Sequence, residues 1–459
     1  MFFQRVKTKG LGHNAYMLGC GEGLAVVVDP RRDVADYLSL ARENNLSIAY
    51  VLETHRQEDF EYGSRNLATA TGAKIVAGTH ALFGESDVRL ADGGELTVGT
   101  TRFVLLETPG HTPESVCYAV YPKDTEGACW GVFTGDTLFV GETGRTDLTD
   151  SEKTGENAGF LYDAVHKRIA PLGDQALILP SHGSGSACGG NISDRDDTTL
   201  GIEKATNPVF RKSRPEFIQQ KIAEKLPRPP YFRHMEEVNL HGDRPLQAMP
   251  AGHLLQPRQL QQRMREGLLI DTRSPEAFAG AHIPGSYNIW LDGLSTFGGW
   301  IANRQTKIFL VVDQPDEAHK AVQALARVGI DGVEGVLLKG VENWREQGLP
   351  IEALGTTSAE EVATWLRDAP VQILDVRDDM EWEEMHIPDA MHTYVGYLEK
   401  NLPKLPKTTR LVVHCSVGHR SGLAASILRK HGYTGVLNML GGITAWKKLG
   451  LPLQEAKAG

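Results

Sequence analysis

The sequence predicts an α/β protein of three domains, and three observations support this class. Residues 1 to 240 alternate short apolar runs with amphipathic segments, as α/β domains do. Beyond residue 250 the sequence repeats itself at an offset of roughly one hundred positions, which indicates a duplicated domain rather than a solenoid. A chain of 459 residues with 41% hydrophobic residues is also too long for one hydrophobic core.

Charge, cysteine content and hydropathy exclude several classes of protein. A formal net charge of −10, with no block of Lys and Arg, speaks against binding to nucleic acid. Five scattered cysteines predict reduced thiols in the cytoplasm rather than a disulfide framework. The first residues do not read as a signal peptide and no run of 18 apolar residues occurs, so we expect a cytoplasmic protein without a membrane span.

In the first 240 residues, side chains that can bind a metal follow four apolar runs. His55 follows AYVLET and His111 follows FVLLETPG, while Asp136 follows GVFTG and His182 follows ALILPS. A sheet presents its site residues at the ends of its strands, so we expect these four residues to lie near one site. For each histidine taken singly, an ordinary polar role remains open.

The motifs THRQEDF, TPGHTPES, TGDTLFVGETGRTDL and LPSHGSGSACG, in this order, resemble those of the metallo-β-lactamase superfamily and, within it, of the persulfide dioxygenases. The resemblance covers nearly all of the first 240 residues and implies an αββα sandwich. The first motif of the superfamily is His-x-His-x-Asp-His, and here Gln57 and Phe60 replace two of its histidines. Because Phe60 cannot bind a second metal ion, we do not expect a dinuclear hydrolase.

The ligands that remain are His55, His111 and Asp136. Two imidazoles and one carboxylate are the ligand preference of non-haem Fe(II) oxygenases. The resemblance to the persulfide dioxygenases implies one Fe(II) ion per chain, rather than zinc, bound to these three residues. His182 would then either support the metal ligands from behind or face the substrate, and the guanidinium of Arg145 would receive a carboxylate of the substrate. A domain that binds no metal and only supports its neighbours is the alternative.

Two boundaries divide the chain. Residues 241–252 are rich in Gly and Pro and predict a linker, and residues 355–358 mark a second boundary. We therefore expect domains at 1–240, 253–354 and 356–455. Within the last two, Asp271 aligns with Asp375, as expected for two copies of one domain.

The segment LVVHCSVGHRS at 411–421 predicts a strand that feeds a helix through an anion-binding turn. Backbone N–H groups of the turn and the N-terminus of the helix would favour Cys415 as a thiolate. His419 and Arg420 add cationic character at the rim of the turn. A buried structural cysteine is the alternative.

A cysteine followed after four residues by an arginine resembles the rhodanese family of sulfurtransferases. The related dual-specificity phosphatases have one more residue in this loop, so the spacing favours sulfur transfer. The resemblance implies that Cys415 carries a persulfide and that Arg420 and His419 assist it. The turn that would bind the substrate consists of Ser416, Val417, Gly418 and Ser421. In the first copy Asp313 aligns with Cys415 and no arginine follows, so that copy is expected to be an inactive rhodanese-like domain.

Together these patterns predict an enzyme that oxidises a low-molecular-weight thiol persulfide to sulfite and transfers sulfane sulfur to or from thiosulfate. A sulfur-carrier or persulfide-sensing protein, in which only Cys415 reacts, is a second hypothesis. A zinc thioester hydrolase resembling glyoxalase II is a third. The expected partners are small sulfur compounds, and relatives suggest a homo-oligomer; the sequence leaves open whether glutathione, coenzyme A or bacillithiol carries the substrate sulfur.

Overall fold

The computed structural model describes residues 2–242, 250–368 and 371–455. Contacts divide the chain into two compact units: Met1–Glu224 with Tyr231–Ala248, and Lys225–Pro230 with Met249–Gly459. Most of the linker predicted at 241–252 lies outside the described residues. In the part of the chain that is described, no helix combines the length and the apolar character that a bilayer span requires.

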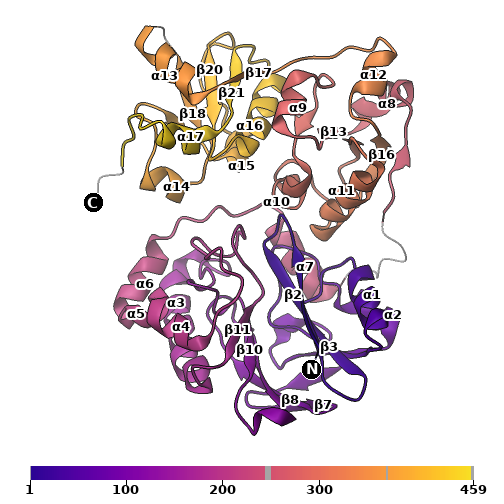
Figure 1. Cartoon of the computed structure of the whole chain (residues 1–459), viewed down its shortest axis with the longest axis vertical. Coiled ribbons are helices and arrows are strands. Elements are labelled where there is room, and N and C mark those ends of the chain that lie inside the picture. The colour runs from indigo at the N-terminus through magenta and orange to yellow at the C-terminus, as the bar shows by residue number, and fades with distance from the viewer. Residues whose placement is uncertain (1, 243–249, 369–370, 456–459) are drawn as a thin grey trace. The chain divides into compact units, whose positions relative to one another are not determined.

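The first unit contains two sheets that pack face to face (Figure 1). A core of side chains from both sheets, including Tyr16, Val26, Phe103 and Phe133, fills the space between them. The first sheet has the order β1 (Phe3–Thr8), β2 (His13–Gly19), β3 (Leu24–Val28), β4 (Ser47–Leu52), β5 (Lys74–Gly78), β6 (Val88–Leu90). The second has the order β11 (Leu177–Pro180), β10 (Gly131–Gly135), β9 (Val116–Pro122), β8 (Thr101–Glu107), β7 (Glu95–Val98).

Helices cover the outer face of each sheet, which confirms the αββα sandwich. Tyr37 and Leu67, from α1 and α2, pack on the first sheet, and Leu161, Leu200 and Phe217 pack on the second. The helices of this unit are α1 (Ala35–Glu43), α2 (Ser64–Thr71), α3 (Thr154–Ala164), α4 (Leu200–Thr206), α5 (Pro208–Arg211), α6 (Arg214–Ala223) and α7 (Phe232–His241). Short turns are η1 (Ala81–Phe83), η2 (Lys123–Thr125), η3 (Ser151–Lys153), the π-helical η4 (Val165–Ile169) and η5 (Ala170–Leu172).

The strand β9 shows how the sequence builds these layers. Tyr118 and Val120 face the core between the sheets, whereas Cys117 and Ala119 face the outer helices. Successive side chains of a strand point to opposite faces, so a strand buried on both faces is apolar at every position. The continuous apolar run at 116–120 is therefore the expected pattern for an inner strand of a four-layer sandwich.

The second unit contains two five-stranded parallel sheets with the same topology, as the duplication predicts. The first is β12 (His253–Leu254), β16 (Val333–Leu337), β15 (Ile308–Val311), β13 (Leu268–Asp271), β14 (Tyr287–Asn288). The second is β17 (Gly355–Thr357), β21 (Val436–Met439), β20 (Leu411–His414), β18 (Gln372–Asp375), β19 (Met391–His392). The fold class predicted from the sequence is thus confirmed for both halves of the chain.

Helices flank both parallel sheets, and the two copies contact one another within this unit. The backbone N–H of Asn288, in β14, donates a hydrogen bond of 3.0 Å to Ser426 Oγ of α16. The first copy has α8 (Pro257–Arg263), η6 (Met264–Glu266), α9 (Pro275–Gly280), η7 (Leu291–Gly293), α10 (Leu294–Ile301), α11 (Pro315–Arg327) and α12 (Glu342–Glu346). The second has α13 (Ala359–Asp368), α14 (Asp379–Glu384), α15 (Val395–Leu398), α16 (His419–Lys430) and α17 (Gly442–Lys448).

Candidate functional site

The three predicted metal ligands meet at one end of the sandwich. His55 follows β4, His111 lies between β8 and β9, and Asp136 follows β10. The Oδ2 atom of Asp136 lies 3.5 Å from His111 Nε2 and 3.8 Å from His55 Nε2. All three side chains are fully buried.

Hydrogen bonds on the far side of each imidazole orient these ligands. His111 Nδ1 donates to the backbone carbonyl of Arg145 at 2.9 Å, because a carbonyl oxygen can only accept. His55 Nδ1 lies 3.0 Å from the hydroxyl of Thr54. Such contacts on one ring nitrogen direct the other toward a metal. In the described part of the chain, neither Nε2 atom has a hydrogen-bond partner. Two unpartnered nitrogens beside a buried carboxylate fit the donor set of a single metal ion.

Asp29 holds two of the strand ends together. Its Oδ2 accepts hydrogen bonds of 2.7 Å from both Thr54 Oγ1 and Ser181 Oγ, and its Oδ1 accepts the backbone N–H of Thr54 at 2.9 Å. These contacts link the residue before His55 to the residue before His182. Asp29 thereby fixes the distance between two parts of the site that come from different sheets.

Both ring nitrogens of His182 lie within hydrogen-bond distance of carboxylate oxygens. Its Nδ1 lies 2.8 Å from Asp136 Oδ1, and its Nε2 lies 2.9 Å from Asp59 Oδ2. Burial lowers the pKa of His182, but the carboxylates of Asp136 and Asp59 outweigh it and raise that pKa well above its usual value. Phe60, which replaces a motif histidine, packs its ring 4.1 Å from that of His13. His182 is therefore placed to orient Asp136.

Two further residues lie at the site that sequence reasoning missed. Glu58 Oε1 is 3.3 Å from His111 Nε2, and Glu58 Oε2 is 3.9 Å from His55 Nε2. The thiol of Cys188 donates to Glu58 Oε1 at 3.1 Å. Glu58 stands at a position of the first motif where any residue can occur, and Cys188 lies in a loop. The sequence pattern therefore marked neither of them as a site residue. A strand-end carboxylate beside His55 was the only hint available.

Charges in the site compensate one another. Burial raises the pKa of Glu58, but His111 and His55 outweigh it and hold that pKa well below its usual range. Burial lowers the pKa of His111, whereas Glu58 and Asp136 raise it to about 9. A metal ion would have to displace this proton from the imidazole.

Arg145 is placed beside the site mainly by its backbone. Its carbonyl accepts from His111, while its guanidinium makes two hydrogen bonds of 2.7 Å to Asp147. The side chain is only 1% exposed. To receive a substrate carboxylate as predicted, the guanidinium of Arg145 would have to bind that carboxylate and Asp147 at the same time.

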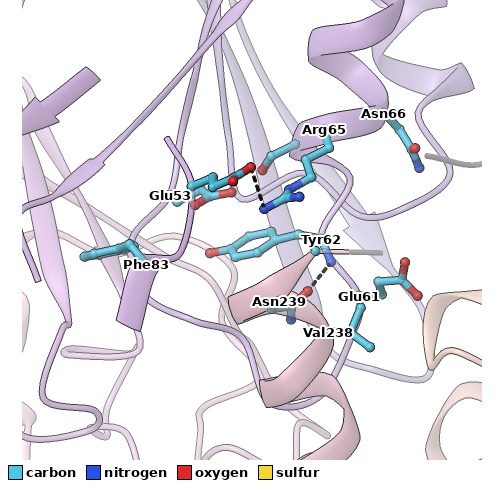
Figure 2. Close-up of a pocket in the computed structure, with 11 residues that line it drawn as sticks. Glu53, Glu61, Tyr62, Arg65, Asn66, Phe83, Val238 and Asn239 are labelled. Atoms are coloured by element: carbon cyan, nitrogen blue, oxygen red, sulfur yellow. Dashed lines mark hydrogen bonds and ion pairs between the residues drawn. The ribbon is translucent and has the colours of Figure 1, made fainter. Parts of the chain in front are cut away.

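A small pocket lies behind the THRQEDF loop and is lined in part by Glu53, Tyr62, Arg65 and Asn239 (Figure 2). Asn239, from α7, accepts the backbone N–H of Tyr62 at 2.9 Å and donates to the carbonyls of Gln57 and Phe60 at 2.8 Å each. Tyr62 in turn donates its hydroxyl to the carbonyl of His55. The pocket contains none of the predicted metal ligands, but Tyr62 and Asn239 in its walls fix the loop that carries His55, one of those ligands.

In the second unit, Cys415 lies between β20 and α16, as the strand–turn–helix pattern predicts. Its Sγ accepts the backbone N–H of Gly418 at 3.1 Å and lies 3.5 Å from the hydroxyl of Ser421. Gly442, with a φ of 50°, packs so closely that a Cβ there would lie 2.2 Å from the carbonyl oxygen of Cys415. Position 442, which packs directly against the turn, therefore requires glycine.

The rim of this turn is not uniformly basic. Arg420 is bound by the carboxylate of Glu381, a residue of α14 that sequence reasoning did not single out. His419 is exposed, and its ring lies 5.0 Å from that of Trp290 in the first copy. Val417 is 50% exposed, and Ser416 donates its hydroxyl to Glu381 at 2.9 Å.

The first copy has a different group at the equivalent turn. Asp313 follows β15, and its backbone N–H donates to Glu317 at 3.1 Å. Burial raises the pKa of Asp313, although Arg273 opposes the shift. A carboxylate cannot form a persulfide, so the predicted inactivity of this copy is consistent with its chemistry.

Comparisons with known proteins find relatives of both folds. The family described as "Rhodanese-like domain" matches residues 256–347 and 358–449. A metallo-β-lactamase from Staphylococcus aureus subsp. aureus COL is 30% identical, with 74% of this chain and 99% of that chain covered at a TM-score of 0.64. The mitochondrial persulfide dioxygenase ETHE1 of Homo sapiens is 28% identical over 47% of this chain and 78% of its own length. A hydroxyacylglutathione hydrolase from Polaromonas sp. strain JS666 is 29% identical over 50% of this chain and 92% of its own length.

Fold and site therefore define a metallo-β-lactamase-fold protein with a buried histidine–carboxylate cluster and a separate cysteine turn. The chain belongs to the metallo-β-lactamase family through its first part, where it is related to the persulfide dioxygenases, and it carries two rhodanese-like domains. These relationships support an enzyme of sulfur metabolism.

Proposed function

We propose that this protein oxidises a low-molecular-weight thiol persulfide to sulfite and transfers sulfane sulfur through Cys415. The overall oxidation consumes one persulfide, O2 and water, and yields the thiol and sulfite. The observation that carries the proposal is the pair of unpartnered Nε2 atoms of His55 and His111 beside Asp136. We assign these three residues to one Fe(II) ion, which would supply open positions for O2 and the substrate sulfur.

Residues around the three ligands hold the ligands in position. Arg145 fixes the tautomer of His111 through its backbone carbonyl, and His182 orients Asp136 through Nδ1. The ligands are fully buried, so bulk water is largely excluded from their nitrogens and oxygens. A dry site strengthens the attraction between the carboxylates and a cation.

Sulfur transfer is assigned to the turn around Cys415. The Cys415 thiolate would attack the outer sulfur of a thiol persulfide, release the thiol, and keep that sulfur as its own persulfide. Sulfite would then attack the outer sulfur, so that thiosulfate leaves and the Cys415 thiolate is restored. The reverse sequence consumes thiosulfate. The N–H of Gly418 is positioned to stabilise negative charge on the sulfur. The hydroxyl of Ser421 lies 3.5 Å from that sulfur and donates its proton to Asn438 at 2.7 Å.

We further propose the three domains 1–240, 253–354 and 356–455, the second an inactive rhodanese-like domain, and a cytoplasmic location. The partners would be a thiol persulfide, sulfite and thiosulfate, with a homo-oligomer as the assembly.

A second candidate function is a sulfur carrier whose first unit binds no metal. It is favoured by the charge compensation among Glu58, His111, His182 and Asp59, which would keep the cluster stable with protons alone. A zinc thioester hydrolase is the third candidate, and it is opposed by Phe60, which leaves no imidazole at that position of the second cluster.

Product analysis of three proteins side by side tests the proposal. Given a thiol persulfide and O2, the wild type should accumulate thiosulfate. Cys415→Ser should take up O2 at the same rate but release sulfite, and His111→Ala should lose O2 uptake while it keeps sulfur transfer from thiosulfate to a thiol. If His111→Ala consumes O2 like the wild type, the first unit is not the oxygenase and the carrier hypothesis gains support. If Cys415→Ser still produces thiosulfate, the coupling is wrong.

A further inference from the structure

The carboxylate of Glu58 lies beside two of the predicted metal ligands, His55 and His111. Donor atoms of His55, Glu58 and His111 all lie within 4.8 Å of one another. Glu58 is 1% exposed, and its Oε2 has no hydrogen-bond partner among the described residues. A buried carboxylate oxygen that faces two imidazole nitrogens without a hydrogen bond lies in a typical setting for a cation ligand.

An ion pair with His111 accounts for only one of the two carboxylate oxygens of Glu58. The 3.3 Å contact between Glu58 Oε1 and His111 Nε2 leaves that nitrogen without a hydrogen bond of normal geometry. His55 Nε2 is in the same condition. Glu58 Oε2 and both Nε2 atoms thus lack hydrogen bonds of normal geometry, although Glu58 Oε1 lies at ion-pair distance from His111.

The residue that replaces the second histidine of the first motif lies on the other side of the His55 ring from Glu58. Gln57 stands at that position, and its amide nitrogen lies 3.5 Å from His55 Nδ1, the nitrogen that does not face the centre. Glu58, the next residue, places its carboxylate on the Nε2 side of the His55 ring. Cys188 donates its thiol to Glu58 Oε1 and thereby holds the carboxylate in this orientation.

We propose that Glu58 is a fourth protein ligand, so that the metal is held by two histidines and two carboxylates. This inference rests on the proposed metal centre and deepens it. Two carboxylates neutralise the charge of a divalent ion; carboxylate ligands suit Mn(II), and two histidines with a carboxylate suit Fe(II). These four residues would hold the ion, which would supply the chemistry for binding O2 and the substrate sulfur.

Metal titration of the full-length protein tests this without relying on activity. Anaerobic Co(II) and Mn(II) binding would be measured by competition with a chelator, together with the visible spectrum of bound Co(II), for the wild type and Glu58→Gln. We expect the affinity of Glu58→Gln to fall by about 10-fold or more and its Co(II) bands to shift. Glu53→Gln is the matched control, because Glu53 is also a buried glutamate near the end of β4 but does not face the centre.

Different outcomes would contradict the assignment of Glu58 as a ligand and the proposed metal centre itself. Unchanged affinity and unchanged Co(II) bands in Glu58→Gln would overturn the ligand assignment and leave the metal centre intact. A wild type that binds neither ion would overturn the proposed function and this inference with it. If Glu58→Gln does not fold, Glu58→Ala with added acetate replaces it: acetate should restore metal affinity to Glu58→Ala but not to His111→Ala, and equal effects on both would contradict the assignment.

Discussion

Arg420 and Glu381 are joined by two parallel hydrogen bonds, Nη1 to Oε2 at 2.6 Å and Nη2 to Oε1 at 2.7 Å. Burial raises the pKa of Glu381, but Arg420 outweighs it and lowers that pKa to about 2, so the carboxylate is ionised at neutral pH. The guanidinium predicted to attract anions is therefore neutralised by its partner. In the first copy the aligned position holds Ala277, and no arginine follows Asp313 within its turn.

Replacing Glu381 by Gln should change how the Cys415 turn handles dianions. Without the carboxylate, Arg420 presents a net positive charge, so the KM for thiosulfate should fall by roughly 3- to 10-fold, while kcat falls because the arginine is held less firmly. Steady-state kinetics with thiosulfate and a thiol would measure both. Glu383→Gln is the control, because Glu383 lies on the same helix and pairs with Lys225 outside the turn. An unchanged KM with a reduced kcat would mean that Glu381 only braces the loop.

Of the five cysteines, only Cys415 should be required for sulfur transfer. Cys415→Ser should reduce thiosulfate:thiol sulfurtransferase activity to background, because serine cannot carry a sulfane sulfur. Ser at Cys20, Cys117, Cys129 or Cys188 should leave most of this activity, although all five thiols are buried. The check is a sulfurtransferase assay of each variant, with its fold monitored by circular dichroism. Retention of activity in Cys415→Ser would refute the assignment.

The wild type should bind one metal ion per chain. Phe60 cannot act as a ligand, and both nitrogens of His182 are engaged by carboxylates, so a second ion would have to use Asp59, His182 and Cys188. Elemental analysis after anaerobic reconstitution with Fe(II) would give the stoichiometry. Chelation should abolish O2 uptake and spare sulfurtransferase activity. Two equivalents of zinc with thioester hydrolysis would instead support the hydrolase hypothesis.

Burial of Glu53 should make the stability of the first unit depend on pH. Burial raises the pKa of Glu53 to about 7 from 4.5, so the folded state retains a proton that the unfolded state loses. Its contribution to stability is complete below pH 4.5 and is lost as the pH rises through 7, a change on the order of 3 kcal/mol. Glu53→Gln should therefore gain melting temperature relative to the wild type between pH 5 and pH 8. A difference that is constant with pH would contradict this pKa shift.

Local patterns in the sequence determined the turn at Cys415 and the duplicated domain. The thiol, the N–H of Gly418 and the hydroxyl of Ser421 lie within seven consecutive residues, so one strand–turn–helix segment already brings them together. The duplicated α/β domain could be predicted from the sequence for a related reason. A repeated order of apolar runs and turns specifies a repeated order of strands.

The metal cluster was only partly predictable. Strand ends indicated His55, His111 and Asp136, because a sandwich presents its loops at one end. Tertiary structure alone decided that Glu58 faces these residues, that Asp29 fixes the loops, and that Glu381 neutralises Arg420. Glu58 and Cys188 are 130 positions apart in the chain, and Glu381 and Arg420 are 39 apart. Contacts between side chains from different elements depend on how the layers pack and on which way each loop turns, and neither is encoded in the periodicity of a single segment.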